Sequence, residues 1–251
     1  MTCDLTCVIT GHQEARMSIA SLRSFWAAIA FARGRGYTVQ PLLFLDRPDS
    51  LTEKIFEEYR LDALQVHQMD AGDQGKVRNA AVALAQGRYT AFLDADDLWS
   101  RDWLVQALEF LSDKPEGVIA HPAYNYFFEG QATIFCQIDQ EAPEFSMDML
   151  RAGNYWDALC VCPTQIYRDH PFCDRDIAGG WAFEDWHWNC ETIASGCLHK
   201  IVPDSVLFKR RQASSQTVKA SGNRSMIRPS PLSRYDSSVY AAPSSDGILS
   251  S

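Results

Sequence analysis

The first half of the chain alternates short apolar runs with segments whose apolar residues recur at helical spacing. The apolar runs, which we expect to be strands, cover residues 5–10, 39–45, 64–68 and 89–93. The expected helices cover residues 17–33, 51–59, 76–86 and 102–111. This order is typical of a parallel sheet with helices on both faces, because each parallel strand pair needs a right-handed crossover. We therefore expect an α/β fold with a mostly parallel central sheet flanked by helices. No G-x-G-x-x-G or P-loop motif is present, which argues against dehydrogenases and P-loop NTPases.

The strand expected at residues 89–93 leads directly into three carboxylates, Asp94, Asp96 and Asp97. In an open α/β sheet, ligands bind beyond the carboxyl ends of the strands. Carboxylates this close repel one another unless something positive lies among them. Mg²⁺ or Mn²⁺ commonly fills that role, since it takes one or two carboxylates together with the phosphates of a substrate. The alternative is a solvated acidic turn that caps the next helix, and the D-x-D-D pattern alone does not choose between the two.

The second half of the chain has a different character. Strands are expected at residues 118–120, 124–128, 132–137, 158–167 and 199–209, the last interrupted at 203–204. A helix is expected at 184–195, ended by Gly196. From about residue 220 onward the sequence is rich in Ser, Pro and Arg with little periodicity. We expect one domain over 1–221, made of two halves (1–113 and 114–221), and a poorly ordered tail or linker over 222–251.

The net charge of −9 is unevenly distributed, since residues 205–234 hold seven basic residues and no acidic one. The acidic body argues against nucleic-acid binding. The basic segment is a candidate for contact with a phosphate, an anionic membrane surface or the protein's own acidic face; a solvated tail explains its far end equally well. The sequence shows no secretory signal and no apolar run long enough to span a bilayer. We therefore expect a cytoplasmic protein, with the inner face of the membrane as a candidate location. The eight cysteines include no C-x-x-C pair, so we expect reduced thiols and no structural zinc.

Three segments together resemble the family 2 glycosyltransferases. The first comprises Gly75-Lys76-Val77-Arg78-Asn79, Gly87-Arg88-Tyr89 and Asp94-Ala95-Asp96-Asp97. The second is Cys7-Val8-Ile9-Thr10 with Glu14, and the third runs from Gly179-Gly180 to Glu184-Asp185-Trp186. The resemblance covers roughly residues 5–215, in the family's order. It implies the GT-A fold, a Rossmann-like half that binds a nucleotide-sugar (1–113) fused to a mixed half that binds the acceptor (114–221).

The resemblance also implies roles for individual residues. The donor would contact Thr10, His12, Glu14, Asp46, Arg78, Asp94 and Arg211. Mn²⁺ or Mg²⁺ would bind Asp96, with Asp94 and Asp97 as further candidates. Asp185 would be the general base, with Glu184 as the second candidate, and Trp181 and Trp186 would stack against an acceptor sugar. Ordinary structural roles are the alternatives: helix capping for His12, Glu14, Glu184 and Asp185, a solvent-facing arginine for Arg78, and core packing for tryptophans, Trp188 included.

Three departures from the family's pattern bear on specificity. His12-Gln13 replaces the customary Tyr-Asn, which leaves the base preference open. Asp46-Arg47-Pro48-Asp49 replaces a frequent pair of aspartates after the second strand. The Lys209-Arg210-Arg211 and Ser214-Ser215 run only loosely resembles the family's closing Arg…Ser element. The absence of a Q-x-x-R-W motif argues against a processive polysaccharide synthase.

Taken together, these features favour an inverting, metal-dependent glycosyltransferase. It would move a sugar from a nucleoside-diphosphate sugar to a glycan or lipid-linked acceptor in bacterial surface-glycan synthesis. A UDP-sugar is the first candidate for the donor. One alternative is a nucleotidyltransferase acting on sugar phosphates, although Gly11-His12-Gln13-Glu14 is a poor glycine-rich phosphate loop. The other is a catalytically silent module of a longer protein that binds nucleotide or glycan.

Overall fold

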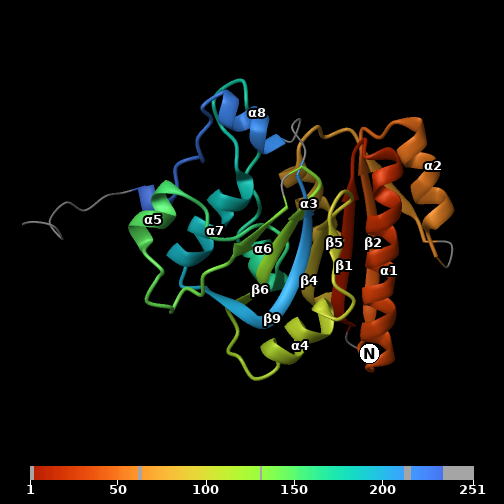
Figure 1. The fold of residues 1–251 in the computed structure, drawn as a ribbon, viewed down its shortest axis with the longest axis horizontal. Coiled ribbons are helices and arrows are strands. Elements are labelled where there is room, and N and C mark those ends of the chain that lie inside the picture. The colour runs from red at the N-terminus through yellow and green to blue at the C-terminus, as the bar shows by residue number, and fades with distance from the viewer. Residues whose placement is uncertain (1–2, 62–63, 131, 212–215, 234–251) are drawn as a thin grey trace, which may run out of the picture.

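The computed structural model describes residues 3–61, 64–130, 132–211 and 216–233. The strands are β1 (Cys3–Gly11), β2 (Val39–Asp46), β3 (Val66–Met69), β4 (Gly87–Asp94), β5 (Leu98–Trp99), β6 (Val118–Phe128), β7 (Thr133–Cys136), β8 (Val161–Pro163) and β9 (Leu198–Arg210). The α-helices are α1 (Ser18–Gly34), α2 (Ser50–Tyr59), α3 (Gln74–Leu84), α4 (Trp103–Leu111), α5 (Met147–Ala152), α6 (Thr164–Asp169), α7 (Glu184–Ala194) and α8 (Gln216–Gly222), with 3₁₀ turns η1 (Ala15–Met17) and η2 (Pro231–Ser233). The nine strands form one sheet in the order β3-β2-β1-β4-β8-β6-β9-β5, with β7 paired to β6 (Figure 1).

The first half is the parallel sheet that the sequence predicts. β3, β2, β1 and β4 are neighbours and run parallel. Thr10 on β1 is in register with Phe44 on β2 and with Asp94 on β4, so the three strands end at the same edge. That edge is where the candidate site lies.

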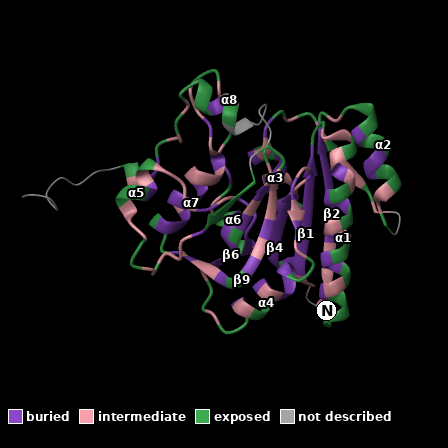
Figure 2. Ribbon diagram, viewed as in Figure 1, coloured by how far each residue is buried: buried purple, intermediate pink, exposed green. Residues whose placement is uncertain are grey.

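Alternate residues of the central strands pack into two cores, one on each face of the sheet. On β1, Cys7 and Ile9 belong to the core built with α1, α2 and α4, whereas Val8 belongs to the core built with α3, α6 and α7. On β4, Leu93 joins the first core and Phe92 the second. The strands are therefore buried on both sides, as expected for strands covered by crossover helices (Figure 2).

The second half is mixed, as predicted, but two of its elements differ from the prediction. The two strands expected over 118–128 are the single strand β6, which runs parallel to β9 with a bulge between Pro122 and Tyr124. Opposite this bulge, Pro122 pairs with Val202 and Tyr124 with Val206, so the interruption expected at 203–204 is the place where β9 carries the extra residues. Asp204 there has a positive φ of 57°.

The prediction of a strand over 158–167 was wrong for most of its length. Only β8 is extended, and α6 begins at Thr164. Pro163 has no N–H to continue the ladder, and the Thr164 hydroxyl donates to Gly87 O at 2.6 Å. Ile166 and Tyr167 are then buried from a helix, which a short apolar run does not distinguish from a strand.

The C-terminal segment packs on the second half as far as it is described. Met226 forms a parallel bridge with Trp181, and its N–H and C=O bond to Gly180 and Ala182. Leu232 accepts a hydrogen bond from Arg151 and contacts the core under α5 and α7. The division of the chain at residue 221 stays a prediction, and residues 234–251 lie outside the described part. Among the described helices, none is long and apolar enough to cross a bilayer.

Candidate active site

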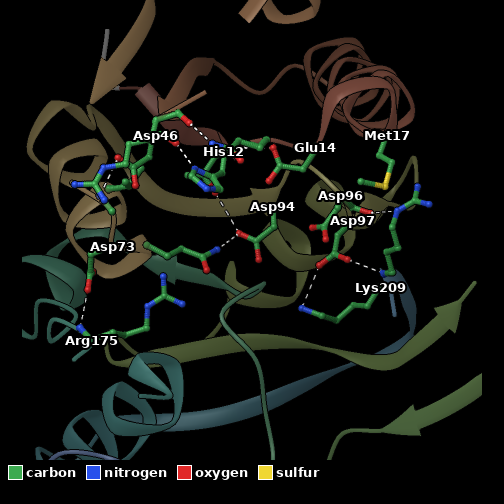
Figure 3. A pocket seen from close by; sticks show the side chains of 18 of the residues that line it. His12, Glu14, Met17, Asp46, Asp73, Asp94, Asp96, Asp97, Arg175 and Lys209 are labelled. Atoms are coloured by element: carbon green, nitrogen blue, oxygen red, sulfur yellow. Dashed lines mark hydrogen bonds and ion pairs between the residues drawn. The ribbon is translucent and has the colours of Figure 1, made fainter. Parts of the chain in front are cut away.

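A cavity of about 510 Å³ lies at the carboxyl edge of β1, β2 and β4 (Figure 3). Its lining comes from the β1 loop, the ends of β2 and β4, the start of α3 and the end of β9: Thr10, Gly11, His12, Gln13, Glu14, Met17, Asp46, Arg47, Gly72, Asp73, Gln74, Val77, Asp94, Asp96, Asp97, Arg175, Lys209, Arg210 and Arg211. The structure thus brings every predicted donor-binding residue except Arg78 to the wall of one cavity, and Arg78 lies directly behind it.

The loop after β1 presents one hydroxyl, one imidazole and one carboxylate. The Thr10 hydroxyl donates to Asp94 Oδ1 at 3.2 Å. The Glu14 carboxylate accepts from the backbone N–H of His12 at 2.6 Å, which tightens the turn. The His12 ring bonds through Nδ1 to the carbonyl of Asp46. Burial raises the pKa of Glu14, because the charged form loses hydration.

Asp46 ends β2 and orders the loop that follows β3. Its Oδ1 accepts from the backbone N–H groups of Ala71 at 2.7 Å and Gly72 at 3.1 Å. This fixes the loop beside the first turn of α3, which Asp73 caps by accepting from the Lys76 N–H at 2.9 Å.

Arg78 occupies the interior between the cavity and α7. Its Nη2 bonds Asp94 Oδ1 at 3.1 Å, and its Nη1 bonds Glu184 Oε1 at 3.1 Å. Burial opposes its charge, but Asp94 and Glu184 outweigh that effect and raise the pKa of Arg78 above its usual value. Because the side chain is almost wholly buried and paired on two sides, the solvent-facing alternative is wrong.

Asp94 is the most heavily engaged of the three clustered carboxylates. Besides Arg78 and Thr10, Gln74 donates to its Oδ1 at 2.6 Å. Burial alone would raise the pKa of Asp94, but the charges of Arg78 and then Lys209 hold it below its usual value. Asp94 is therefore ionised and fixed in place by the protein itself.

Asp97 and Asp96 have opposite surroundings. Asp97 is buried, accepts from the Arg210 N–H at 2.8 Å and pairs with Lys209 Nζ at 3.1 Å. The Asp96 carboxylate makes no ion pair or hydrogen bond to another described residue. Burial, followed by the charges of Asp94 and Glu14, raises the pKa of Asp96 to about 6. Burial also raises the pKa of Asp97 to about 7, against the effect of Lys209. Asp96 is thus the carboxylate of the three that a cation from outside would stabilise most.

Protein ligands alone do not form a metal cage in the described part of the chain. No three His, Cys, Asp or Glu side chains there are grouped as a metal site would require. The site instead offers one carboxylate without a partner beside an open cavity, which fits an ion that takes most of its ligands from a substrate.

A second cavity of about 130 Å³ adjoins the first and holds the predicted catalytic pair. Glu184 is paired on both oxygens, with Arg78 at 3.1 Å and with Arg175 Nε at 3.7 Å. Among the described residues Asp185 has no ion-pair partner, and its Oδ1 accepts from the N–H of Trp186 at 2.8 Å. Burial, then the charge of Glu184, raises the pKa of Asp185 to about 6, while Arg78 opposes the rise. Of the two carboxylates, Asp185 is the one available to accept a proton.

Neither cavity is lined by the predicted acceptor tryptophans. Trp186 lies on α7, donates from its indole to Leu150 O at 2.7 Å and packs against α5. Trp181 pairs with Met226 and lies under the Arg228 guanidinium. Trp188 is a core residue on the far side of α7. Acceptor contact by Trp181 and Trp186 stays a prediction, and the contacts described above give each of them a structural role as well.

The basic segment meets the protein's own surface where it is described. Lys209 pairs with Asp97, Arg210 with Glu129 and Arg228 with Asp174. Arg211 lines the larger cavity and packs its guanidinium over Phe127 at 4.0 Å. Ser214 and Ser215, predicted to complete this element, lie outside the described residues.

Among the site residues that were not predicted, three contact the charged groups described above. Arg175 lines both cavities, and its N–H donates to Asp73 Oδ2 at 2.6 Å. Gln74 holds Asp94. Asp157 pairs with Lys209 Nζ at 3.4 Å and accepts from Asn125 at 2.6 Å. Of these, only Gln74 had a signal in the sequence, because it closes the polar loop just before the helix predicted over 76–86.

A family model and several curated proteins match this chain. The family model described as "Glycosyl transferase family 2" matches residues 36–172. Poly(ribitol-phosphate) beta-N-acetylglucosaminyltransferase TarS of Staphylococcus aureus is 29% identical over 129 residues, which are 50% of this chain and 21% of TarS. An uncharacterized glycosyltransferase of Nostoc sp. is 34% identical over 96 residues, 36% of this chain and 28% of its own length. The chain therefore spans about a quarter of the length of these curated relatives.

Solved structures share the fold. The crystal structure of S. aureus TarS 1–349 in complex with UDP-GlcNAc superposes with a TM-score of 0.63 at 16% identity, covering 84% of this chain and 60% of that one. The mannosyltransferase PcManGT from Pyrobaculum calidifontis in complex with GDP-Man and Mn²⁺ gives a TM-score of 0.58 at 16% identity, covering 83% and 57%. The likeness confirms the predicted GT-A fold.

Proposed function

The chain belongs to glycosyl transferase family 2. We propose that it transfers a sugar from a nucleoside-diphosphate sugar to an acceptor hydroxyl and inverts the anomeric configuration. A UDP-sugar is the first candidate for the donor. The observation that carries the proposal is the position of Arg78. One guanidinium bonds Asp94 on the wall of the larger cavity and Glu184 beside Asp185. A donor held at Asp94 and an acceptor activated by Asp185 would thus meet at one rigid junction.

The larger cavity suits a nucleotide-sugar. Its volume of about 510 Å³ is in the range of small-molecule sites. Asp46 and His12 stand at one end, where a base would lie, and Thr10 and Asp94 are placed to meet a ribose. Besides Arg47, four cations line the same cavity and would attract a diphosphate: Arg175, Lys209, Arg210 and Arg211. The structural relatives named as complexes with UDP-GlcNAc and with GDP-Man support a donor of this class.

Mn²⁺ or Mg²⁺ fits the acidic end of this cavity. Asp96 would hold the ion, and Asp94 and Asp97 are the further candidates although cations of the chain already engage both. Bound there, the ion would offset the charge that develops on the leaving diphosphate. Lys209 keeps Asp97 neutralised from the other side, so the ion would not have to balance all three carboxylates.

Asp185 would act as the base of a single displacement. It would accept the proton of the acceptor hydroxyl while that oxygen bonds the anomeric carbon and the diphosphate departs from the opposite face. Glu184 is unsuited to this role because both of its oxygens face arginines. Its contribution is to hold Arg78 and Arg175 in place.

The proposed acceptor and the proposed biosynthetic setting rest on the named relatives alone. A glycan or lipid-linked acceptor in bacterial surface-glycan synthesis agrees with the name of TarS, a poly(ribitol-phosphate) transferase. Action in the cytoplasm, at the inner face of the membrane, and contact of residues 205–234 with that membrane belong to the same proposal.

Calorimetric titration of UDP, GDP, CDP and dTDP, with and without Mn²⁺, tests the donor site. Wild type should bind one of them tightly only with Mn²⁺, and Asp96→Ala should lose the metal dependence. Slow breakdown of the matching donor, with water in place of the acceptor, should then release the nucleoside diphosphate and stop in Asp185→Asn. If no nucleotide binds under any of these conditions, the transferase proposal fails.

A further inference from the structure

The Lys209 side chain lines both cavities, and its ammonium lies between two carboxylates (Figure 3). Nζ is 3.1 Å from Oδ2 of Asp97, which belongs to the turn after β4. It is also 3.4 Å from Oδ2 of Asp157, which belongs to the segment before β8. Asp157 lines neither cavity, so it has no direct contact to offer a ligand in either of them. Its position therefore points to a role that it performs through Lys209.

The Asp157 carboxylate is fixed by contacts on both of its oxygens. Oδ1 accepts from the N–H of Leu159 at 2.9 Å, and Oδ2 accepts from Asn125 Nδ2 at 2.6 Å. Asn125 is buried on β6, and its own Oδ1 has no partner among the described residues. In the β6–β9 ladder Asn125 is in register with Leu207, two residues before Lys209. Side chains two residues apart on a strand share a face, so the sheet itself sets how Asn125 and Lys209 stand around Asp157.

The charge of Lys209 is divided between its two carboxylates. Burial opposes the charged form, but Asp157 and then Asp97 outweigh that effect and raise the pKa of Lys209 above its usual range. An ammonium that faces two carboxylates compensates each of them only in part. Asp97 thus keeps part of its negative charge at the acidic end of the larger cavity.

We propose that Asp157 is a positioning residue for the divalent cation. By sharing Lys209 with Asp97, it preserves the negative charge with which Asp94, Asp96 and Asp97 attract Mn²⁺ or Mg²⁺. Without Asp157 the whole charge of Lys209 would face these three carboxylates and oppose the cation. This role rests on the metal-dependent binding of a nucleoside diphosphate proposed above.

Asp157→Asn tests this role, and Asp139→Asn is the matched control. Asp139 also pairs with a lysine of β9, Lys200 Nζ at 2.6 Å, and accepts backbone N–H groups, but neither Asp139 nor Lys200 lines the two cavities. Calorimetric titration of UDP at a series of Mn²⁺ concentrations gives the Mn²⁺ requirement of binding. Asp157→Asn should raise this requirement about fivefold or more, and Asp139→Asn should change it less than about twofold. At saturating Mn²⁺ both variants should bind UDP within about threefold of wild type, since Lys209 keeps its charge.

The same titration in Lys209→Met shows whether the effect passes through Lys209. In that background Asp157→Asn should change the Mn²⁺ requirement less than about twofold, because the cation that Asp157 shares is gone. An equal change with and without Lys209 would mean that Asp157 acts at long range, and the positioning role would be wrong. If Lys209→Met does not fold or no longer binds UDP, the two aspartate variants decide: equal Mn²⁺ requirements in both overturn the role. Absence of UDP binding by wild type at every Mn²⁺ concentration overturns the proposed function itself.

Discussion

Arg78 and Glu184 are 106 positions apart in the chain, yet Arg78 Nη1 donates to Glu184 Oε1 at 3.1 Å with both side chains nearly excluded from solvent. A buried ion pair gives little net stability, because both ions lose hydration, but removal of one partner leaves the other stranded. Arg78 also holds Asp94, so the contact joins the two halves of the domain at the site.

Glu184→Gln should destabilise the protein by about 3 kcal/mol, because Arg78 and Arg175 lose the charge between them. Urea unfolding measures the change. Glu58→Gln breaks an exposed pair with Lys54 and should cost about 0.5 kcal/mol or less. Equal small losses of unfolding free energy in both variants would show that the buried contact between Arg78 and Glu184 does not stabilise the fold.

Asp185→Asn should lower kcat by about 10² to 10⁴, the usual contribution of general base catalysis, while donor binding changes by less than about twofold. Asparagine keeps the size of the side chain but cannot accept the proton. Turnover and calorimetric binding on the same preparation separate the two effects. A variant with near-normal kcat would remove Asp185 from the chemistry.

The pH dependence of kcat should follow the pKa of Asp185, which burial raises to about 6. The base works as the carboxylate, so kcat at saturating donor should level off above pH 6 and fall up to tenfold per unit below it. The residual activity of Asp185→Asn should lack this acid limb. A wild-type kcat that is unchanged from pH 8 to pH 5 would contradict the assignment.

Asp96→Asn and Asp97→Asn remove the same charge from adjacent positions and should behave differently. Asp96→Asn should lose metal-dependent nucleotide binding and keep or slightly raise the melting temperature, since it relieves repulsion by Asp94 and Glu14. Asp97→Asn should lose about 1–3 kcal/mol of stability, because the half-buried Lys209 loses a partner. Thermal unfolding and titration with Mn²⁺ check both, and identical behaviour of the two variants would be inconsistent with the geometry.

Acid should destabilise the fold through a buried histidine pair. His121 Nε2 and His199 Nδ1 are 2.8 Å apart, and His199 Nε2 is 2.9 Å from the Thr192 hydroxyl. Burial lowers the pKa of His121 from 6.5 to about 3, so between these values the unfolded chain binds more protons than the folded one. Stability should therefore fall as pH drops below 6.5, by up to about 1.4 kcal/mol per unit for this residue. His121→Leu should show a shallower dependence in urea unfolding between pH 7 and 5; an unchanged slope would contradict the assignment.

The carboxyl edge of the sheet was predictable because neighbouring parallel strands end together. Thr10, Asp46 and Asp94 each close an apolar run, and the run itself locates them in space. Arg175 had no such signal, since it lies in an irregular loop. It reaches the site because Asp73 binds its N–H and because Gly75 lets Cys173 O approach, where a Cβ would be only 2.6 Å away.

The second half was harder to predict because its apolar runs are short. An apolar run such as 158–167 is compatible with a buried strand and with a buried helix. In the structure the strand ends at Pro163, and the helix begins at Thr164, whose hydroxyl bonds Gly87 O. The tryptophans near α7 show the same limit. Sequence spacing places Trp186 beside Asp185, but its indole is used to bind Leu150 O on α5.

The pairing of Met226 with Gly180 and Ala182 has a consequence for the order in which parts of the site can form during translation. On the ribosome the first half emerges first and can form its parallel strands while the remainder is still being translated. The loop that leads into Asp185 gains its backbone partner only after residue 226 has left the exit tunnel. A nascent chain would thus complete the wall of the larger cavity, whose last lining residue is Arg211, before the loop that leads into Asp185 gains this partner.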